Sequence, residues 1–407
     1  MLTADLCQVA VELDLPPCGY SGCRIEPTDE AARNFGTLLT GPLSASNGLI
    51  CVSVGADGMV AVSNEITGRT FHGCFAYEDC GDCGDGWTRG ALVNDIVFRG
   101  PGSNVSTAIE EDGPLRTVFR IEREFHLPRH VLLPDYVRST DRVSMKVVDY
   151  LCLEKGSPTL RVHTVVNNTA CDHRFRVFFS TGIAAEKSFA ETPFAVLERD
   201  IAVPEESRYW HERTNPEQAF TSFCGLQDTQ GGLAVLSPWG LHEYEVFQTP
   251  DHSLAITLFR ATRQTVGTAG EPDGQLLQEM TFDYQLWPFA GAFDAAEAVR
   301  LVAQQQTGVR THFAETLPES NCFVRLEPGR AVVTAIKPAQ DVDGGVIRLW
   351  NPSDIPVTEC VHVNASFAEA ALCNLNEDPH EAIAVDPEHG MKVTVPSRGL
   401  ATIRFSF

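Results

Sequence analysis

Apolar residues recur at every second position along most of this chain. The pattern predicts strands rich in β-branched and aromatic residues at ten places, residues 49–54, 59–63, 117–121, 160–166, 174–179, 233–236, 254–259, 331–336, 345–350 and 401–405. Turn-forming pairs such as Asp57-Gly58 and Asn167-Asn168 separate these segments. Many of them have apolar residues on one face and Arg, Thr or Ser on the other. This is typical of antiparallel sheets that stack face to face.

Helical periodicity is weak, and its best candidate covers residues 294–306. Asp294 suits the N-cap, Glu297 follows three residues later as in a capping box, and Gly308 marks the end. A pattern of short strands resumes after this helix. We therefore expect an all-β fold in two sandwich-like units, joined by a linker at residues 292–316.

A further strand is predicted at the start of the chain, where Val9, Val11 and Leu13 alternate with other residues. This start has neither the basic region nor the continuous apolar stretch of a signal peptide. We therefore expect a cytoplasmic protein whose 13 cysteines are reduced thiols, mostly buried as small apolar groups.

Composition narrows the choice of partners. The apolar fraction of 43% and the charged fraction of 21% are ordinary for a soluble globular protein. No run of 18 apolar residues is present, so no membrane span is expected. The net charge of −23 would repel nucleic acids and anionic membranes, so neither is expected as a partner.

An acidic, glycine-rich stretch is the most unusual segment, with Asp79, Asp82 and Asp85 at a spacing of three. Such carboxylates ionise together only when they are solvated, paired with cations or hydrogen-bonded to a ligand. Trp87 would stack on a sugar ring, and Arg89 would pair with one carboxylate. Three interpretations stay open: an ordinary Asp-Gly turn cluster, a contact with substrate, and a calcium site, although the spacing differs from that of an EF-hand loop.

Four nearby residues form a weak candidate for a metal site. Cys80 and Cys83 have the spacing of a zinc knuckle, and His72 and Cys74 would complete the set. No second Cys-x-x-Cys pair exists, so free thiols are the favoured interpretation. We expect no metal or cofactor in this chain.

Arg260 closes an apolar strand and is a further candidate for substrate binding. Its guanidinium would bind a carboxylate or a pair of hydroxyls, or it would pair with a structural carboxylate. His163, or His211 with Glu212, would supply the acid–base pair of a sugar mutarotase. A lone histidine on a strand is more often a core or surface residue.

Seven phrases, in order along the chain, resemble the C-terminal region of glycoside hydrolase family 38, the α-mannosidases. They are PPCGY at 16–20, NEITG at 64–68, EDCGDCGDGW at 78–87, PFAVLER at 193–199, GLHEYEV at 240–246, TLFR at 257–260 and RLWNP at 348–352. No phrase is specific alone, but their order and spacing make a strong match. Trp87 stands where the family usually has Tyr, and Cys80 and Cys83 are additions to the acidic phrase.

The resemblance implies a β-supersandwich related to the galactose-mutarotase fold, followed by a smaller C-terminal β-sandwich. The supersandwich would cover residues 46–310 and the smaller sandwich residues 317–407. Residues 1–45 would be a short N-terminal strand segment, the remnant of a small β domain that follows a helical bundle in the family.

The resemblance also implies a function. The family cleaves α-mannosides with retention, through an Asp nucleophile and a Zn²⁺ held by two His and two Asp in an N-terminal barrel. The twelve histidines here include no His-x-Asp phrase, and no alternating β/α pattern predicts that barrel. The chain would therefore be the non-catalytic C-terminal part of a zinc-dependent α-mannosidase, with the zinc held by the intact enzyme only.

Two partners follow from the resemblance: the missing catalytic domain, in the same or a separate chain, and a mannoside. The chain would brace that domain and line part of the substrate pocket. Its tentative substrate-binding residues are Asp79, Asp82, Asp85, Trp87, Arg89 and Arg260. Two alternatives remain, a stand-alone mannoside-binding module and a mutarotase-like sugar epimerase.

Overall fold

The structure is a computed structural model that describes residues 9–26, 29, 35–211, 214–265, 268, 270–386 and 390–407. All ten strands predicted from the alternation are present: β4 (Ile50–Val54), β5 (Val60–Asn64), β10 (Arg116–Pro128), β14 (Leu160–Asn167), β15 (His173–Phe179), β20 (Gly231–Leu236), β22 (Leu254–Ala261), β26 (Val332–Pro338), β27 (Gly344–Trp350) and β33 (Leu400–Ser406). The all-β fold is therefore confirmed. Within the described residues no helix is long and apolar enough to cross a membrane.

The predicted helix is α1 (Ala295–Thr307). The carboxylate of Asp294 caps it by accepting a hydrogen bond of 3.0 Å from the backbone N–H of Glu297, and Gly308 follows its last residue with a positive φ. Start and stop signals in the sequence therefore fixed both ends of this element.

The chain divides into two compact units. The larger unit comprises Asn34–Thr192 and Leu197–Phe293, and the smaller comprises Met1–Arg33, Pro193–Val196 and Asp294–Phe407. The three domain boundaries expected from the sequence stay a prediction.

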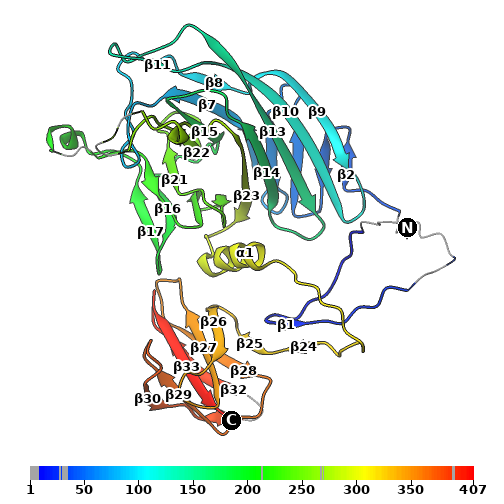
Figure 1. Ribbon diagram of the computed structural model, residues 1–407. Coiled ribbons are helices and arrows are strands. Elements are labelled where there is room, and N and C mark those ends of the chain that lie inside the picture. Colours follow the sequence, from blue (N-terminus) through cyan, green and yellow to red (C-terminus); the bar gives the residue numbers. More distant parts are fainter. Residues whose placement is uncertain are drawn as a thin grey trace, which may run out of the picture. The chain divides into compact units, whose positions relative to one another are not determined.

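The larger unit is built on three antiparallel sheets (Figure 1). Beside β10, β14 and β20, the nine-stranded sheet contains β9 (Ser103–Glu111), β13 (Arg142–Glu154), β16 (Lys187–Thr192), β17 (Ala195–Asp200), β19 (Phe223–Asp228) and β23 (Glu279–Ala290). Beside β15 and β22, the six-stranded sheet contains β7 (Ala76–Gly81), β8 (Phe98–Gly100), β18 (Gln218–Ala219) and β21 (Glu243–Val246). The five-stranded sheet adds β2 (Leu39–Gly41), β3 (Ser44–Ser46) and β6 (Thr70–Cys74) to β4 and β5.

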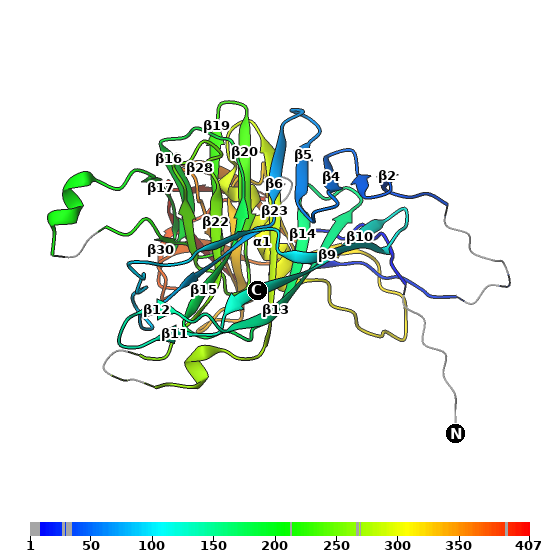
Figure 2. The same ribbon diagram turned by 90° about the horizontal axis from the view of Figure 1, so that it is seen from above.

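Short elements complete this unit. They are the ribbon β11 (Val131–Leu132) and β12 (Val137–Arg138), and the 3-10 turns η1 (Glu205–Tyr209) and η2 (Asp273–Gln275). The turn η1 lies in a loop that projects away from the sheets in both views (Figures 1 and 2).

One apolar core joins the inner faces of the large sheets. Alternate residues of β15 point into it, and the ring of Phe175 stacks on Tyr77 of β7 at 5.1 Å. From the opposite sheet, Phe125 of β10 contacts both of these rings, and Tyr284 of β23 contacts Phe179. Burial of these large side chains is the main stabilising term for such a sandwich.

The smaller unit contains a second sandwich with its own core. One sheet has β25 (Val324–Glu327), β28 (Val357–Val363), β32 (Gly390–Val395) and β31 (Val385–Asp386). The other has β26, β27, β33, β29 (Glu369–Cys373) and β30 (Pro379–Ala382). Two residues of β1 (Gly19–Tyr20) also pair with β24 (Asn321–Cys322).

Two details differ from the sequence-based expectations. The predicted strand at Val9–Leu13 is wrong for this chain, because no neighbouring strand pairs with it among the described residues. The acidic stretch is not one loop, because its first four residues continue β7 as far as Gly81. Glycine and aspartate favour turns, but the pairing of β7 with β15 and β8 overrides that preference here.

Candidate functional site

Strands β7, β15 and β22 present one face of the six-stranded sheet to the core and the opposite face outward. Arg174 and Arg176 of β15 lie on the outward face, directly opposite Cys80 and Glu78 of β7. A candidate site forms where this face meets the loop after β7.

The structure separates the three aspartates of the acidic stretch. Asp79 is buried and points toward the core, where it pairs with His173 and Arg138. Asp82 is also buried, and its Oδ2 accepts a hydrogen bond of 2.7 Å from Nε of Arg260. Asp85 is only partly buried.

Asp82 organises the loop between β7 and β8. Its Oδ1 accepts hydrogen bonds from the backbone N–H groups of Gly84 at 2.9 Å and Gly90 at 3.0 Å. Both glycines are required, because a Cβ on either would lie about 2 Å from backbone atoms of the other strand of the loop, at 1.9 and 2.3 Å. The Arg260 guanidinium also donates to the carbonyl of Thr88 at 3.0 Å, so it fixes both sides of the loop.

Asp85 closes the tip of the loop. Its Oδ1 accepts from the backbone N–H groups of Thr88 at 2.8 Å and Trp87 at 2.9 Å, and these donors lower the pKa of the carboxyl. The Trp87 side chain is 77% exposed. Arg89 turns away from the tip and pairs with Glu217 at 3.2 Å.

A pocket of about 290 Å³ lies beside this loop. Its lining residues come from the loop, from β21 and its approach, and from β22: Asp85, Gly86, His242, Glu243, Thr257, Arg260 and Thr262. The structure thus brings Asp85 and Arg260 together at one pocket. Asp82 lies behind it as the partner of Arg260, whereas Asp79, Trp87 and Arg89 do not line it.

A β-bulge in β22 sets the outward face of this strand. Phe175 is opposite Phe259, but Arg176 is opposite Thr257, so Leu258 is the extra residue. Leu258 and Phe259 are therefore both buried in the core, and Thr257 and Arg260 both line the pocket. Strict alternation would have placed these two polar side chains on opposite faces.

Glu243 and Thr257 also line the pocket, although neither was predicted from the sequence as a site residue. Thr257 donates a hydrogen bond of 2.5 Å to Oε1 of Glu243, which fixes the carboxylate at the pocket. The TLFR phrase could have indicated the position of Thr257. Its two adjacent apolar residues break the alternation and indicate a bulge.

Buried ion pairs support the pocket from the sheet. Glu78 accepts from Nε of Arg176 at 3.0 Å and from Nε of Arg99 at 3.0 Å. Burial acts to raise the pKa of Glu78, but the two guanidinium groups outweigh it and hold the pKa below its ordinary value of 4.5.

This pairing predicts an acid-sensitive contribution to stability. A carboxyl with a depressed folded pKa stabilises the fold fully above its unfolded pKa, and the contribution is lost as the pH falls below about 4.5. Glu78→Gln should therefore flatten the fall in the urea midpoint between pH 5 and pH 3, measured by circular dichroism. Glu65→Gln, at an exposed turn, is the matched control. An unchanged pH profile in Glu78→Gln would contradict the assignment.

The weak metal candidates do not form a site. His72 is exposed, and burial raises the pKa of the Cys74 thiol to about 12. Burial, aided by Asp172, raises the pKa of Cys83 to about 11. In the parts of the chain that the structure describes, no three His, Cys, Asp or Glu side chains are placed to hold a metal ion, and twelve cysteines are free.

The structure describes two of the three residues considered for a mutarotase. His163 pairs with Asp283, with Nδ1 and Oδ1 2.8 Å apart, on a partly exposed sheet face. His211 is exposed, and Glu212 lies outside the described residues.

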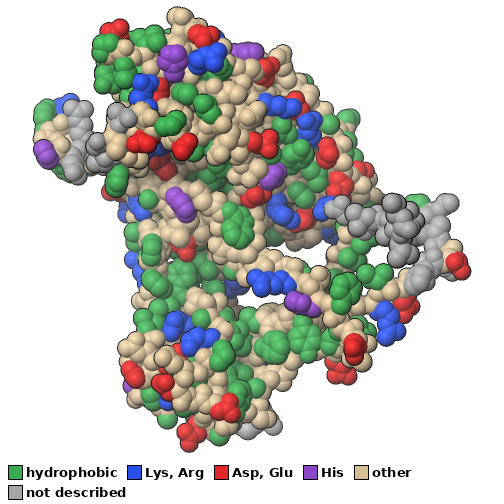
Figure 3. Space-filling view, viewed as in Figure 1, with side chains coloured by type: hydrophobic (Ala, Val, Ile, Leu, Met, Phe, Trp, Pro, Cys, Tyr) green, Lys and Arg blue, Asp and Glu red, His purple; other side chains and the backbone are tan. Residues whose placement is uncertain are grey.

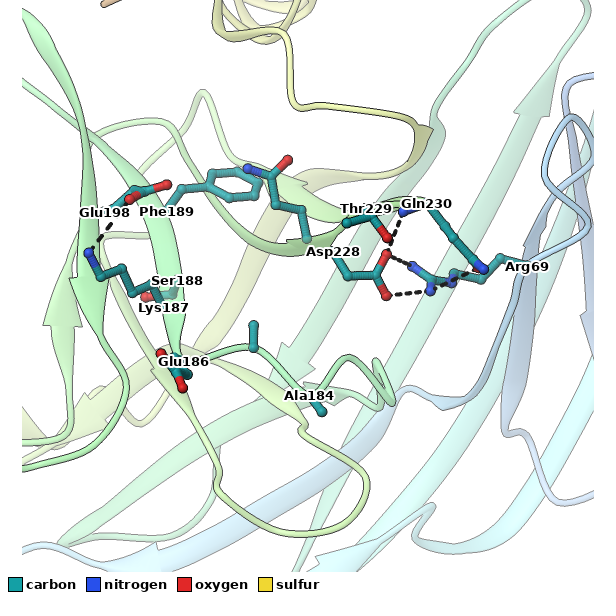
Figure 4. Close-up of a pocket in the computed structure, with 12 residues that line it drawn as sticks. Arg69, Ala184, Glu186, Lys187, Ser188, Phe189, Glu198, Asp228, Thr229 and Gln230 are labelled. Atoms are coloured by element: carbon teal, nitrogen blue, oxygen red, sulfur yellow. Dashed lines mark hydrogen bonds and ion pairs between the residues drawn. The ribbon is translucent and has the colours of Figure 1, made fainter.

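A second hollow of about 490 Å³ lies at the β16 and β19 edge of the nine-stranded sheet. Figure 4 shows its polar rim, where Arg69 forms a two-pronged pair with Asp228 and Lys187 faces Glu198. The carboxylate of Glu186 is drawn without a partner among these residues. The hollow contains none of the residues predicted from the sequence.

Comparison with known proteins decides the family. The model of the glycosyl hydrolases family 38 C-terminal domain matches residues 45–275, more than half of the chain, and that of the family 38 C-terminal β-sandwich domain matches residues 330–399. The chain belongs to glycoside hydrolase family 38.

Individual relatives agree with this family. A putative mannosylglycerate hydrolase from Halalkalibacterium halodurans is 24% identical over 95% of this chain and 44% of its own length. An α-mannosidase from Enterococcus faecalis V583 superposes with a TM-score of 0.81 at 23% identity, over 92% of this chain and 43% of that one. A family 38 protein from Enterococcus faecalis gives 0.79 at 22% identity, over 93% and 46%. The family 38 chain thus spans less than half the length of these relatives.

Proposed function

We propose that the chain is the non-catalytic C-terminal part of a retaining, zinc-dependent α-mannosidase, which braces a catalytic domain and lines part of its substrate pocket. The observation that carries this proposal is the pocket at the acidic loop. It gathers two carboxylates, a guanidinium and two hydroxyls, from segments that the family resemblance had singled out.

The chemistry of the pocket suits the hydroxyls of a neutral sugar. Glu243 offers an oxygen, Oε2, for which the described residues provide no hydrogen-bond partner, and Nη1 of Arg260 is likewise unused. Asp82 already pairs with Arg260, and Nη1 of Arg174 lies 3.8 Å from Oε1 of Glu243, so both groups have a partner of opposite charge within the chain. A polyol would donate hydrogen bonds to the oxygens of Asp85 and Glu243 and accept one from the Arg260 guanidinium.

The zinc of the proposed enzyme does not fit this chain. The described residues gather no set of three ligands, and a catalytic zinc requires three or four. Under the proposal, zinc and nucleophile are supplied by the catalytic domain. A cytoplasmic location is also part of the proposal, which the free cysteines support.

A stand-alone mannoside-binding module is the second candidate. It is favoured by the fact that every residue of the pocket belongs to the larger unit, so that the pocket is complete without another chain.

Titration with methyl α-mannoside tests the pocket. The purified chain should bind this sugar weakly, with a Kd of about 1 mM or above. Binding is measured from the changes in amide chemical shifts near Glu243. Glu243→Gln should weaken binding about tenfold, whereas Glu186→Gln in the second hollow is the matched control and should leave it unchanged. A Kd in the low micromolar range would favour the stand-alone module. The absence of any shift at the pocket would contradict both candidates.

A further inference from the structure

The β1–β24 ribbon brings two cysteines close together. Gly19 of β1 is paired with Cys322 of β24, and Cys18 directly precedes this pair. A Cβ on Gly19 would lie 2.0 Å from the carbonyl oxygen of Asn321, so only glycine permits this approach of the two segments. The spacing of paired strands puts the Cα atoms of Cys18 and Cys322 about 6 Å apart, and a disulfide requires about 4.4–6.8 Å. The backbone of the ribbon therefore permits a disulfide, although both cysteines are free thiols here.

The side chains of these cysteines are also placed to meet. Cys18 has a positive φ of 45°, so it does not follow the alternation that puts successive side chains of a strand on opposite faces. Sγ of Cys322 donates a hydrogen bond of 3.0 Å to the carbonyl of Pro17, which is bonded to the nitrogen of Cys18. The pKa of the Cys18 thiol is raised by burial and, second, by the negative charge that Cys322 carries when it is ionised. The sulfur of Cys322 thus lies beside the backbone and the thiol of Cys18.

Few other contacts hold the ribbon among the described residues. It has two paired positions and a hydrogen bond of 2.8 Å between the hydroxyls of Ser21 and Ser320. The rings of Tyr20 and Phe323 meet at 5.7 Å, yet both remain more than 40% exposed. Side chains of the hydrophobic class are visible at the surface in this region of Figure 3. An isolated two-stranded ribbon is marginal in water, so a covalent bond across it would have a large effect.

We propose that Cys18 and Cys322 form a reversible disulfide that fastens the N-terminal segment to the strand preceding the C-terminal sandwich. The cysteines lie on either side of the whole larger unit in the sequence, since Pro17 and Cys322 are 305 positions apart. A cross-link that closes so long a loop strongly restricts the unfolded chain. The inference goes beyond the proposed function and does not depend on sugar binding.

A small disulfide such as oxidised glutathione is the oxidant. Cys18, which is exposed, loses its thiol proton to water and attacks one sulfur of the oxidant, so a mixed disulfide forms and one glutathione thiolate leaves. Cys322 then loses its proton and attacks Sγ of Cys18, and the second glutathione thiolate leaves. The two leaving thiolates take up the two protons. Two protein thiols are thus oxidised and one small disulfide is reduced to two thiols. Disulfides of this kind in a reducing compartment are transient and serve redox sensing.

Peptide mapping after oxidation tests the site. The full chain is treated with oxidised glutathione in mildly alkaline buffer, because the raised pKa of Cys18 disfavours its thiolate at neutral pH. Free thiols are then alkylated, and the digest is analysed by mass spectrometry without reduction. We expect a pair of peptides joined through Cys18 and Cys322, which separates on reduction with dithiothreitol.

Three serine variants complete this test. Cys18→Ser and Cys322→Ser should each abolish the joined peptides. Cys23→Ser is the matched control and should leave them unchanged, because Cys23 is also exposed but lies beyond the contact of Ser21 with Ser320, further from Cys322 along the ribbon.

Hydrogen exchange measures the effect of the bond. Amides of residues 18–21 and 321–323 should exchange about tenfold more slowly in the oxidised chain than in the reduced chain, and Cys18→Ser should show no slowing. Recovery of Cys18 as a free thiol, or only as its glutathione adduct, would overturn the proposal. A bond from Cys18 to Cys23 or to a second chain would also overturn it. Joined peptides without slower exchange would contradict the fastening of the ribbon.

Discussion

Asp149→Ala is expected to lower the free energy of unfolding of the larger unit by about 3–5 kcal/mol. Asp149 and Arg123 are both fully buried, with Nη1 and Oδ2 3.0 Å apart. The other oxygen, Oδ1, accepts from Tyr77 Oη and Thr164 Oγ1, each at 2.7 Å. Removal of the carboxylate leaves a guanidinium charge and two hydroxyl donors in the core without their acceptor. The unpaired buried charge lowers the free energy of unfolding by far more than the intact ion pair adds to it.

Chemical denaturation followed by far-UV circular dichroism measures this effect. Asp283→Ala, at a partly exposed site on the same sheet, is the matched control and should change the unfolding free energy by less than about 0.5 kcal/mol. The double variant Arg123→Met with Asp149→Leu should recover most of the loss, because it removes both charges. A loss below about 1 kcal/mol in Asp149→Ala would show that the buried pair is not formed.

Glu359→Ala should have the second large effect, confined to the C-terminal sandwich. Glu359 is fully buried in β28, and its carboxylate accepts three backbone N–H groups, from Gly329 at 2.8 Å, Arg330 at 2.6 Å and Ala331 at 2.7 Å. The loop between β25 and β26 therefore depends on one side chain. We expect a loss of about 3 kcal/mol, since three buried donors lose a charged acceptor.

Hydrogen exchange resolved by peptide checks this prediction. Amides of residues 329–331 and of β26 should exchange faster in Glu359→Ala, while those of β13 and β14 in the larger unit should not change. Glu381→Ala, at an exposed position of β30, is the matched control. If amide exchange became equally faster in both units, the two cores would not be independent.

Local pattern predicts the all-β class, ten of the strands and the one α-helix of the described residues. The ten predicted strands and the capped helix depend on neighbouring residues, and all of them are present. The strand at Val9–Leu13 was wrong because a strand requires a partner, and pattern alone does not reveal whether that partner is in the chain.

The candidate site was only partly predictable, because long-range pairing decides which face each residue occupies. Asp82 and Arg260 are 178 positions apart, and nothing local indicates that they form a pair. Asp79 carries the same charge as Asp85, but the register of β7 against β15 turns it into the core. The bulge at Leu258 moves Thr257 onto the face of Arg260, which strict alternation excludes.

Hydrolysis of an aryl α-mannoside by the purified chain tests the proposal that this family 38 chain binds sugar but performs no hydrolysis. We expect no turnover above buffer, with or without added zinc. We also expect zinc-dependent turnover once the catalytic portion of a family 38 α-mannosidase is added. Zinc-dependent hydrolysis by the chain alone would contradict the proposal.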